Sequence, residues 1–159
     1  MAVVPVKCFL SSKESEGNAI SAYSENKTQF SDPDILCEAL ADMGFSADMV
    51  ERHQIATNLF GYHGDKRDDT AEIILRRKYV NAVLSGGASN DIGFKRDANG
   101  KYSAIISQFD SHYANEKWMN KLKQTYAVKG IQKQASKNGL RLSGQKTVNG
   151  KIQMQFVKV

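Results

Sequence analysis

The residues of this sequence with the most distinctive chemistry are basic and lie at its C-terminal end. From position 117 to position 159 the chain holds ten of its 22 basic residues and no Asp or Glu. They are Lys117, Lys121, Lys123, Lys129, Lys133, Lys137, Arg141, Lys146, Lys151 and Lys158. The preceding 116 residues hold the other 12 basic residues and all 17 acidic ones, so the formal net charge of +5 conceals two unlike parts. Because cationic side chains neutralise phosphates, this asymmetry predicts a polyanionic partner.

Five of these lysines lie in a row with four-residue spacing, which is interrupted only by Thr125. They are Lys117, Lys121, Lys129, Lys133 and Lys137. On a helix such a row winds slowly around the surface. Solvated helical faces usually interleave Glu with Lys at this spacing, and no acid does so here. A nucleic acid, another acidic partner, or plain solvent could face the row, and we prefer nucleic acid because an anion relieves the repulsion between lysines.

The expected nucleic-acid-binding residues combine phosphate contacts with base stacking, and we expect the C-terminal part to form one continuous basic surface. The residues are Lys117, Lys121, Lys123, Lys129, Lys133, Lys137, Arg141 and Lys146, with Tyr102 and Tyr113 as stacking rings. Aromatic rings beside lysines suit unpaired bases, although each ring taken singly is more often part of a core. RNA or single strands are favoured because no helix-turn-helix or zinc finger that could read a duplex groove is found in the sequence.

Other chemistry has weaker support in the sequence. The segment 61–72 collects His63, Asp65, Asp68, Asp69 and Glu72, but their spacing matches no metal-ligand pattern, and acids in loops usually point to water. Gly86-Gly87 lacks the lysine and the following helix of a phosphate-binding loop. We therefore expect no metal, no cofactor and no enzymatic activity.

Two helices and several strands must position these residues. One helix is expected at about 32–43, where Asp32 can cap and Pro33 suits the first turn, and another at about 115–137, with Trp118, Leu122 and Tyr126 on its apolar stripe. Alternation and turn residues predict strands at 2–10, 20–30, 50–62, 71–77, 91–96 and 101–109. A last hairpin, 140–147 with 151–159, turns at Asn149-Gly150.

This order of elements predicts an α+β fold in a single domain over 1–159, mainly an antiparallel sheet with two packing helices and the C-terminal β-hairpin. Positions 1–19 are expected to be an N-terminal extension, 61–70 a charged turn and 78–89 a mobile loop. The two cysteines, Cys8 and Cys37, form no C-x-x-C pair, and no membrane span or signal peptide is evident. We therefore expect a cytoplasmic protein without membrane contact.

Four short stretches are similar to one family, the hypothetical chloroplast-reading-frame family, a domain of unknown function in plastids, cyanobacteria and other bacteria. They are the strand 71–77 (AEIILRR), Asp91-Ile-Gly-Phe94, the helical pattern 118–127 with Leu122, Gln124 and Tyr126, and Asn149-Gly-Lys-Ile152. The resemblance covers about 20–156. It implies a fold and little function, although relatives lie among genes for a AAA ATPase, which implies an adaptor role.

The sequence departs from this family in a few places. Positions 1–19 precede the usual start, 78–89 is longer than the usual link, and Thr125 and Lys129 stand where Arg and His are common. The basic C-terminal part is this chain's own feature. The alternative to nucleic-acid binding is therefore a protein-interaction adaptor that docks its basic helix on an acidic partner such as a AAA ATPase.

Overall fold

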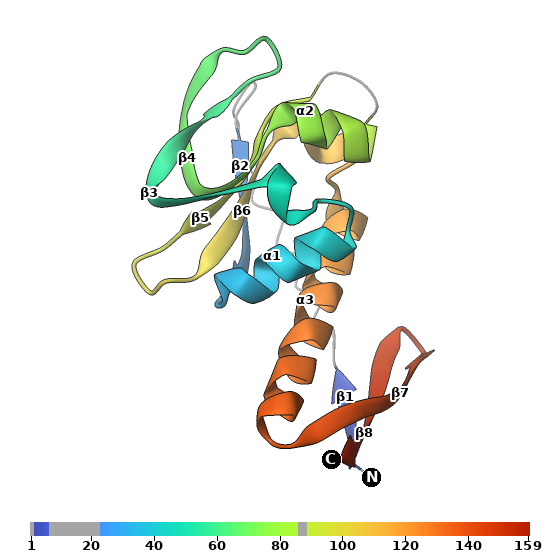
Figure 1. Cartoon of the computed structure of the whole chain (residues 1–159). Coiled ribbons are helices and arrows are strands. Elements are labelled where there is room, and N and C mark those ends of the chain that lie inside the picture. Colours follow the sequence, from blue (N-terminus) through green and yellow to red (C-terminus); the bar gives the residue numbers. More distant parts are fainter. Residues whose placement is uncertain (1, 7–22, 86–88) are drawn as a thin grey trace.

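Two antiparallel sheets share one long helix in this protein (Figure 1). The computed structural model describes residues 2–6, 23–85 and 89–159. One sheet has five strands in the order β2-β6-β5-β4-β3, and the other has three in the order β1-β8-β7. The helix α3 (Glu116–Lys137) runs from the first sheet to the second. The expected α+β fold, with antiparallel strands, two packing helices and a C-terminal hairpin, is confirmed.

The strands of the larger sheet are β2 (Tyr23–Phe30), β3 (Val50–Phe60), β4 (Lys66–Leu75), β5 (Ile92–Arg96) and β6 (Tyr102–Ser107). The hairpin of β5 and β6 turns at 97–100, between the strands predicted at 91–96 and 101–109. The backbone N–H of Asp97 donates to the carbonyl of Lys101 at 2.8 Å, and Gly100 has a φ of 78°. Glycine adopts that left-handed conformation without steric cost, so this turn is set by local sequence.

Helix α1 (Pro33–Asp42) begins as the sequence predicted. The Oδ1 atom of Asp32 accepts hydrogen bonds from the backbone N–H groups of Asp34 (2.9 Å) and Ile35 (3.2 Å), which a helix start leaves without partners. Helix α1, α3 and the short helix α2 (Arg77–Val80) pack on one face of the larger sheet. Their contribution to the core is apolar and fully or almost fully buried, and includes Leu36, Leu40, Val80, Trp118 and Leu122.

The opposite face of the larger sheet is covered by its own β3–β4 hairpin. The pairing of β3 with β4 shifts between Arg52 and Thr57, so β3 bulges and the outer half of the hairpin turns back over the sheet. Leu59 and Ala71 then lie against Gly93, where a Cβ atom would be 2.6 Å from the Cβ of Ala71. This second cluster consists of Leu59, Ala71, Ile74 and Ile105.

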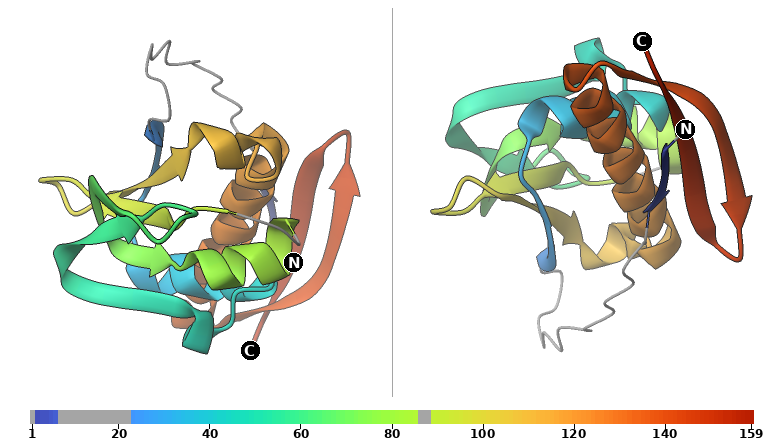
Figure 2. Two further views of the ribbon diagram at one scale, coloured as in Figure 1. Left: turned by 90° about the horizontal axis from the view of Figure 1, so that it is seen from above. Right: turned by 90° about the horizontal axis from the view of Figure 1, so that it is seen from below.

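The smaller sheet brings the two ends of the described chain together. Strands β7 (Leu140–Val148) and β8 (Lys151–Lys158) form a hairpin in which Asn149 and Gly150 have φ values of 51° and 73°. This is the two-residue turn geometry that Asn-Gly favours. Strand β1 (Ala2–Val6) pairs with β8 at the sheet edge, a position in which a strand tolerates a proline such as Pro5 (Figure 2). Ile152, Met154 and Phe156 of β8 form a buried cluster with Ala135 of α3.

Two expectations about loops are wrong. Strand β4 begins at Lys66, so the charged turn is limited to positions 61–65, and the remaining charged residues lie in a strand. Helix α2 and the π-helical turn Asn81–Ser85 occupy most of the expected mobile loop, because Val80 and Val83 pack on the core. Positions 7–19 of the expected N-terminal extension and positions 86–88 lie outside the described residues.

Candidate functional site

The lysine row of α3 is divided by the helix packed beside it. Lys129 Nζ lies 3.0 Å from Asp42 Oδ2, and Lys133 Nζ lies 3.6 Å from Asp32 Oδ2. Both acids belong to the ends of α1, which the sequence could not place beside α3. The expectation of one continuous basic surface is therefore wrong for the middle of the row. Lys117, Lys121 and Lys137 are exposed, and Lys123 is half-buried.

Cations of the hairpin lie on the face of the smaller sheet that points away from α3, called here the outer face. Residues 152, 154 and 156 of β8 are buried, so 151, 153, 155 and 157 point outward. The register places Arg141 opposite Val157, Lys146 opposite Gln153, and Val148 opposite Lys151. The outer face therefore carries Arg141, Lys146 and Lys151 together with Gln153 and Gln155.

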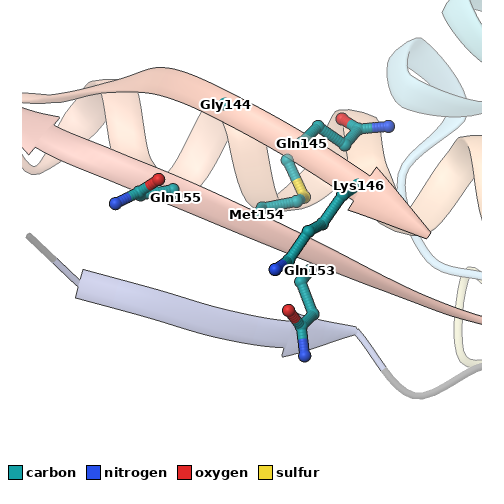
Figure 3. Close-up of a pocket in the computed structure, with 6 residues that line it drawn as sticks. All are labelled: Gly144, Gln145, Lys146, Gln153, Met154 and Gln155. Carbon is teal, nitrogen blue, oxygen red and sulfur yellow. The ribbon is translucent and has the colours of Figure 1, made fainter. Parts of the chain in front are cut away.

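A shallow hollow of about 390 Å³ opens on this sheet. It is lined by Gly144, Gln145, Lys146, Gln153, Met154 and Gln155 (Figure 3). The register shifts between Leu142 and Gly144, and Gly144 has no side chain to fill the space beside Gln155. Lys146 and Gln153 extend on the same side of the strands. One cation and the three amides of Gln145, Gln153 and Gln155 therefore border the hollow.

A second hollow of about 330 Å³ lies between α3 and β7. It is lined by Asp42, Lys121, Gln124, Thr125, Val128, Lys129, Gln132, Gln145 and Ile152. Gln145 lines both hollows, so polar groups continue from the outer face around β7 to Lys121. Asp42 is paired with Lys129, which leaves Lys121 as the cation of this hollow without a carboxylate partner among the described residues.

The two rings expected to stack on bases are not available for stacking. Tyr102 is 6% exposed and belongs to the core under α1 and α3. Tyr113 is half-buried, and its hydroxyl donates to Asp110 Oδ1 at 2.6 Å. Successive side chains of β6 point to opposite faces of the sheet, and both faces are covered, so every residue of β6 is buried. Tyr102 is therefore buried whichever face it points to.

The acids and histidine of segment 61–72 do not converge. Asp65 pairs with Arg67 at 2.8 Å, and the buried Glu72 accepts a hydrogen bond from the backbone N–H of Arg96 at 2.8 Å. Within residues 2–6, 23–85 and 89–159, no group of three or more His, Cys, Asp or Glu side chains could hold a metal ion.

Sequence spacing does not reveal a partly buried ion network at the start of α2. Arg76 donates to both carboxylate oxygens of Glu51 (2.6 and 2.9 Å) and to Asp91 Oδ2 (2.8 Å). The hydrogen bond from Arg76 lowers the pKa of Glu51. Asp91, 1% exposed, also accepts from the backbone N–H groups of Phe60 and Arg77. These partners are 14 to 31 residues away from Asp91, too far apart for a motif to reveal them.

A second buried acid lies beside this network. Asp110 is 0% exposed, and burial raises its pKa. It accepts hydrogen bonds from the backbone N–H of Asn90 and from Tyr113.

None of the helices in the described part of the chain has the length and apolar character needed to cross a membrane.

Comparison with known proteins identifies the family and no closer relative. No curated protein and no solved structure matches the chain. A family model described as a protein of unknown function (DUF1257) matches residues 39–154. This range contains the four stretches that resembled a family of unknown function, and it reaches from the middle of α1 into β8. The chain therefore belongs to the DUF1257 family of proteins of unknown function.

Proposed function

We propose that this protein binds nucleic acid, RNA or single strands in preference to duplexes, without catalysing a reaction on it. The proposal rests on one observation: the smaller sheet and the part of α3 that follows Glu116, called here the basic module, have basic residues and no acidic ones. The sequence of α3 from Lys117 onward and of strands β1, β7 and β8 contains no Asp or Glu. Strand β1, which comes from the other end of the chain, adds no charge to this module. A surface whose charged side chains are all positive attracts polyanions over a distance.

The cations of this module differ in how far they are neutralised. Lys129 and Lys133 are paired with carboxylates of α1. Arg141, Lys146 and Lys151 on the outer face are exposed, and none has a carboxylate partner among the described residues. These three, with Lys121 and Lys137, are the cations we assign to phosphates.

The side chains between these cations favour single strands. Gln153 and Gln155 lie in the same outer face, and their amides can donate to and accept from the edges of unpaired bases. An exposed sheet surface with basic and amide side chains can contact splayed bases, whereas reading a duplex needs an element that enters a groove. The hollow beside Lys146 is formed by the same strands.

Salt dependence of binding tests the proposal. Affinity for a labelled single-stranded RNA oligomer is measured by fluorescence anisotropy across a salt series. About four to six phosphate contacts give a log–log slope of roughly −3 to −4 on single strands. Replacing Arg141, Lys146 and Lys151 by Gln should flatten the slope by about two and weaken all sequences alike.

A matched variant controls for net charge. Lys66 and Lys95 of the larger sheet and Lys101 of its β5–β6 turn are exposed lysines outside the basic module. Replacing all three by Gln removes the same total charge and should leave the slope close to that of the parent. Binding that is independent of salt, or equal effects of the two triple variants, would contradict the proposal. It would leave the adaptor with an acidic protein partner as the better explanation of the basic module.

A further inference from the structure

Two large aromatic side chains are exposed side by side at the end of the larger sheet, far along the chain from the hairpin. Tyr62 is 41% exposed and Phe109 is 54% exposed. Their rings are nearly parallel, with an interplanar angle of 16° and centroids 6.0 Å apart. The ring of His63 lies against Tyr62 at 3.8 Å between centroids. We call Tyr62, His63 and Phe109 the aromatic cluster.

Buried polar groups hold this cluster in place. The backbone N–H of Tyr62 donates to Asn90 Oδ1 at 2.9 Å, and the backbone N–H of Asn90 donates to the carboxylate of Asp110, the residue after Phe109. Asn90 and Asp110 are 2% and 0% exposed. Burying an amide and a carboxylate is costly, so their hydrogen bonds fix the turn at Tyr62 relative to the segment that carries Phe109.

A cation is fixed beside the cluster. Arg77 Nη1 donates to the backbone carbonyl of Tyr62, and the backbone N–H of Arg77 donates to the buried Asp91. Arg77 has no carboxylate partner among the residues that the structure describes, so its charge is not neutralised there. The nearby acids are already engaged, since Asp65 pairs with Arg67 and Asp110 is buried.

We infer that the aromatic cluster and Arg77 form a stacking site for an unpaired nucleobase and its phosphate. The inference rests on the proposed function and deepens it, because stacking selects single strands over duplexes. An exposed ring offers a face on which any base can stack, and a guanidinium beside it can bind the adjoining phosphate. Positions 113–115 alone separate the 3-10 helix Gln108–His112 from α3, so the same nucleic-acid strand could continue toward Lys117 and Lys121.

Phe109 is the residue to change, because its ring is exposed and its loss leaves the buried hydrogen bonds intact. Phe109→Ala should weaken binding of a single-stranded RNA oligomer about tenfold, as expected for losing one stacked base. The salt slope should stay that of the parent, and affinity for a duplex of the same sequence should not change. Phe109→Trp should retain affinity, and its added fluorescence should be quenched when the oligomer binds.

Ile55, which is 82% exposed on β3, offers a matched control. Ile55→Ala removes a similar apolar surface outside the cluster and should bind single strands like the parent. Thermal melting of each variant confirms folding. Equal affinity of Phe109→Ala and the parent for single strands, or an equal loss on single strands and duplexes, would overturn the stacking site while the salt-dependent binding stands. If the parent protein shows no salt-dependent binding to either the single strand or the duplex, the proposed function and the stacking site are both overturned.

Discussion

Gly93 is a position where the fold leaves no room for a side chain. The back of β5 is covered by the outer half of the β3–β4 hairpin, and Leu59 and Ala71 contact the glycine directly. Strand glycines usually mark such close approaches. The neighbouring Asp91 anchors the same hairpin through the backbone N–H of Phe60. In the segment Asp91-Ile-Gly-Phe94, Asp91 thus binds the hairpin by a hydrogen bond, and Gly93 leaves the space that its side chains fill.

Gly93→Ala should destabilise the protein by about 1–3 kcal/mol, because the new methyl group overpacks the cluster behind the sheet. The midpoint of urea unfolding should fall, and the denaturant slope should stay the same. Gly144→Ala is the matched strand control, since a Cβ there would meet only Gln155 Oε1, at 3.7 Å. Equal unfolding midpoints for Gly93→Ala and the parent would show that the hairpin does not press on β5.

At this scale, the sequence predicts features that depend on neighbouring residues, whereas contacts between residues far apart in the chain cannot be predicted from it. Asp32 as an N-cap and Asn149-Gly150 as a turn depend on neighbours a few residues away, and both were predicted correctly. The pairing of Lys129 with Asp42 joins residues on different helices. The burial of Tyr102 depends on a sheet covered on both faces. No spacing rule contains that information.

At the scale of elements, the junction of α1 with α3 is held by more than apolar contact. The hydroxyl oxygen of Tyr126 accepts hydrogen bonds from the backbone N–H groups of Ser31 (3.1 Å) and Asp32 (2.9 Å). The same ring packs edge-on against Phe30 at 4.9 Å between centroids. Tyr126 was expected on the apolar stripe of α3, and the ring confirms this, whereas its hydroxyl stabilises the start of another helix.

Tyr126→Phe should keep the ring contact and lose the acceptor for two backbone N–H groups. We expect a loss of about 1 kcal/mol in the free energy of unfolding, the usual net value of a hydrogen bond in a protein. Tyr79→Phe is a suitable control, because Tyr79 also packs on the core and no hydrogen bond of its hydroxyl to a described residue is seen. Chemical denaturation of both variants measures the difference. Equal stability of the two variants would mean that water replaces Tyr126 as the acceptor.

At the scale of the whole molecule, the two sheets differ both in their charge and in the size of the core on which they pack. The larger sheet lies within the part of the chain that holds all 17 acidic residues, whereas the smaller sheet has none. Among the side chains whose burial the structure describes, the smaller sheet rests on a cluster of four buried residues, compared with 17 in the cluster under the larger sheet. Segments with few buried apolar contacts open more readily than the main core. The proposed nucleic-acid surface therefore lies on the part of the fold with the smaller core.

Strand β1 is the element whose removal tests this division, because β8 would then become an edge strand. Deleting residues 1–6 removes no charged side chain. Amide hydrogen exchange should become faster in β8 and β7 and stay unchanged in β5 and β6, since β1 pairs only with β8. Mass spectrometry of exchanged peptides resolves the two sheets.

The same deletion separates the shape of the outer face from its charge. The deletion variant keeps Arg141, Lys146 and Lys151, so the salt slope of RNA binding should stay near that of the parent. Affinity at a given salt concentration should fall, because β7 and β8 must be ordered before they hold these cations in one surface. Uniformly faster exchange in both sheets would show instead that β1 supports the entire fold. Unchanged exchange in β8 would show that the pairing with β1 adds nothing to the stability of the smaller sheet.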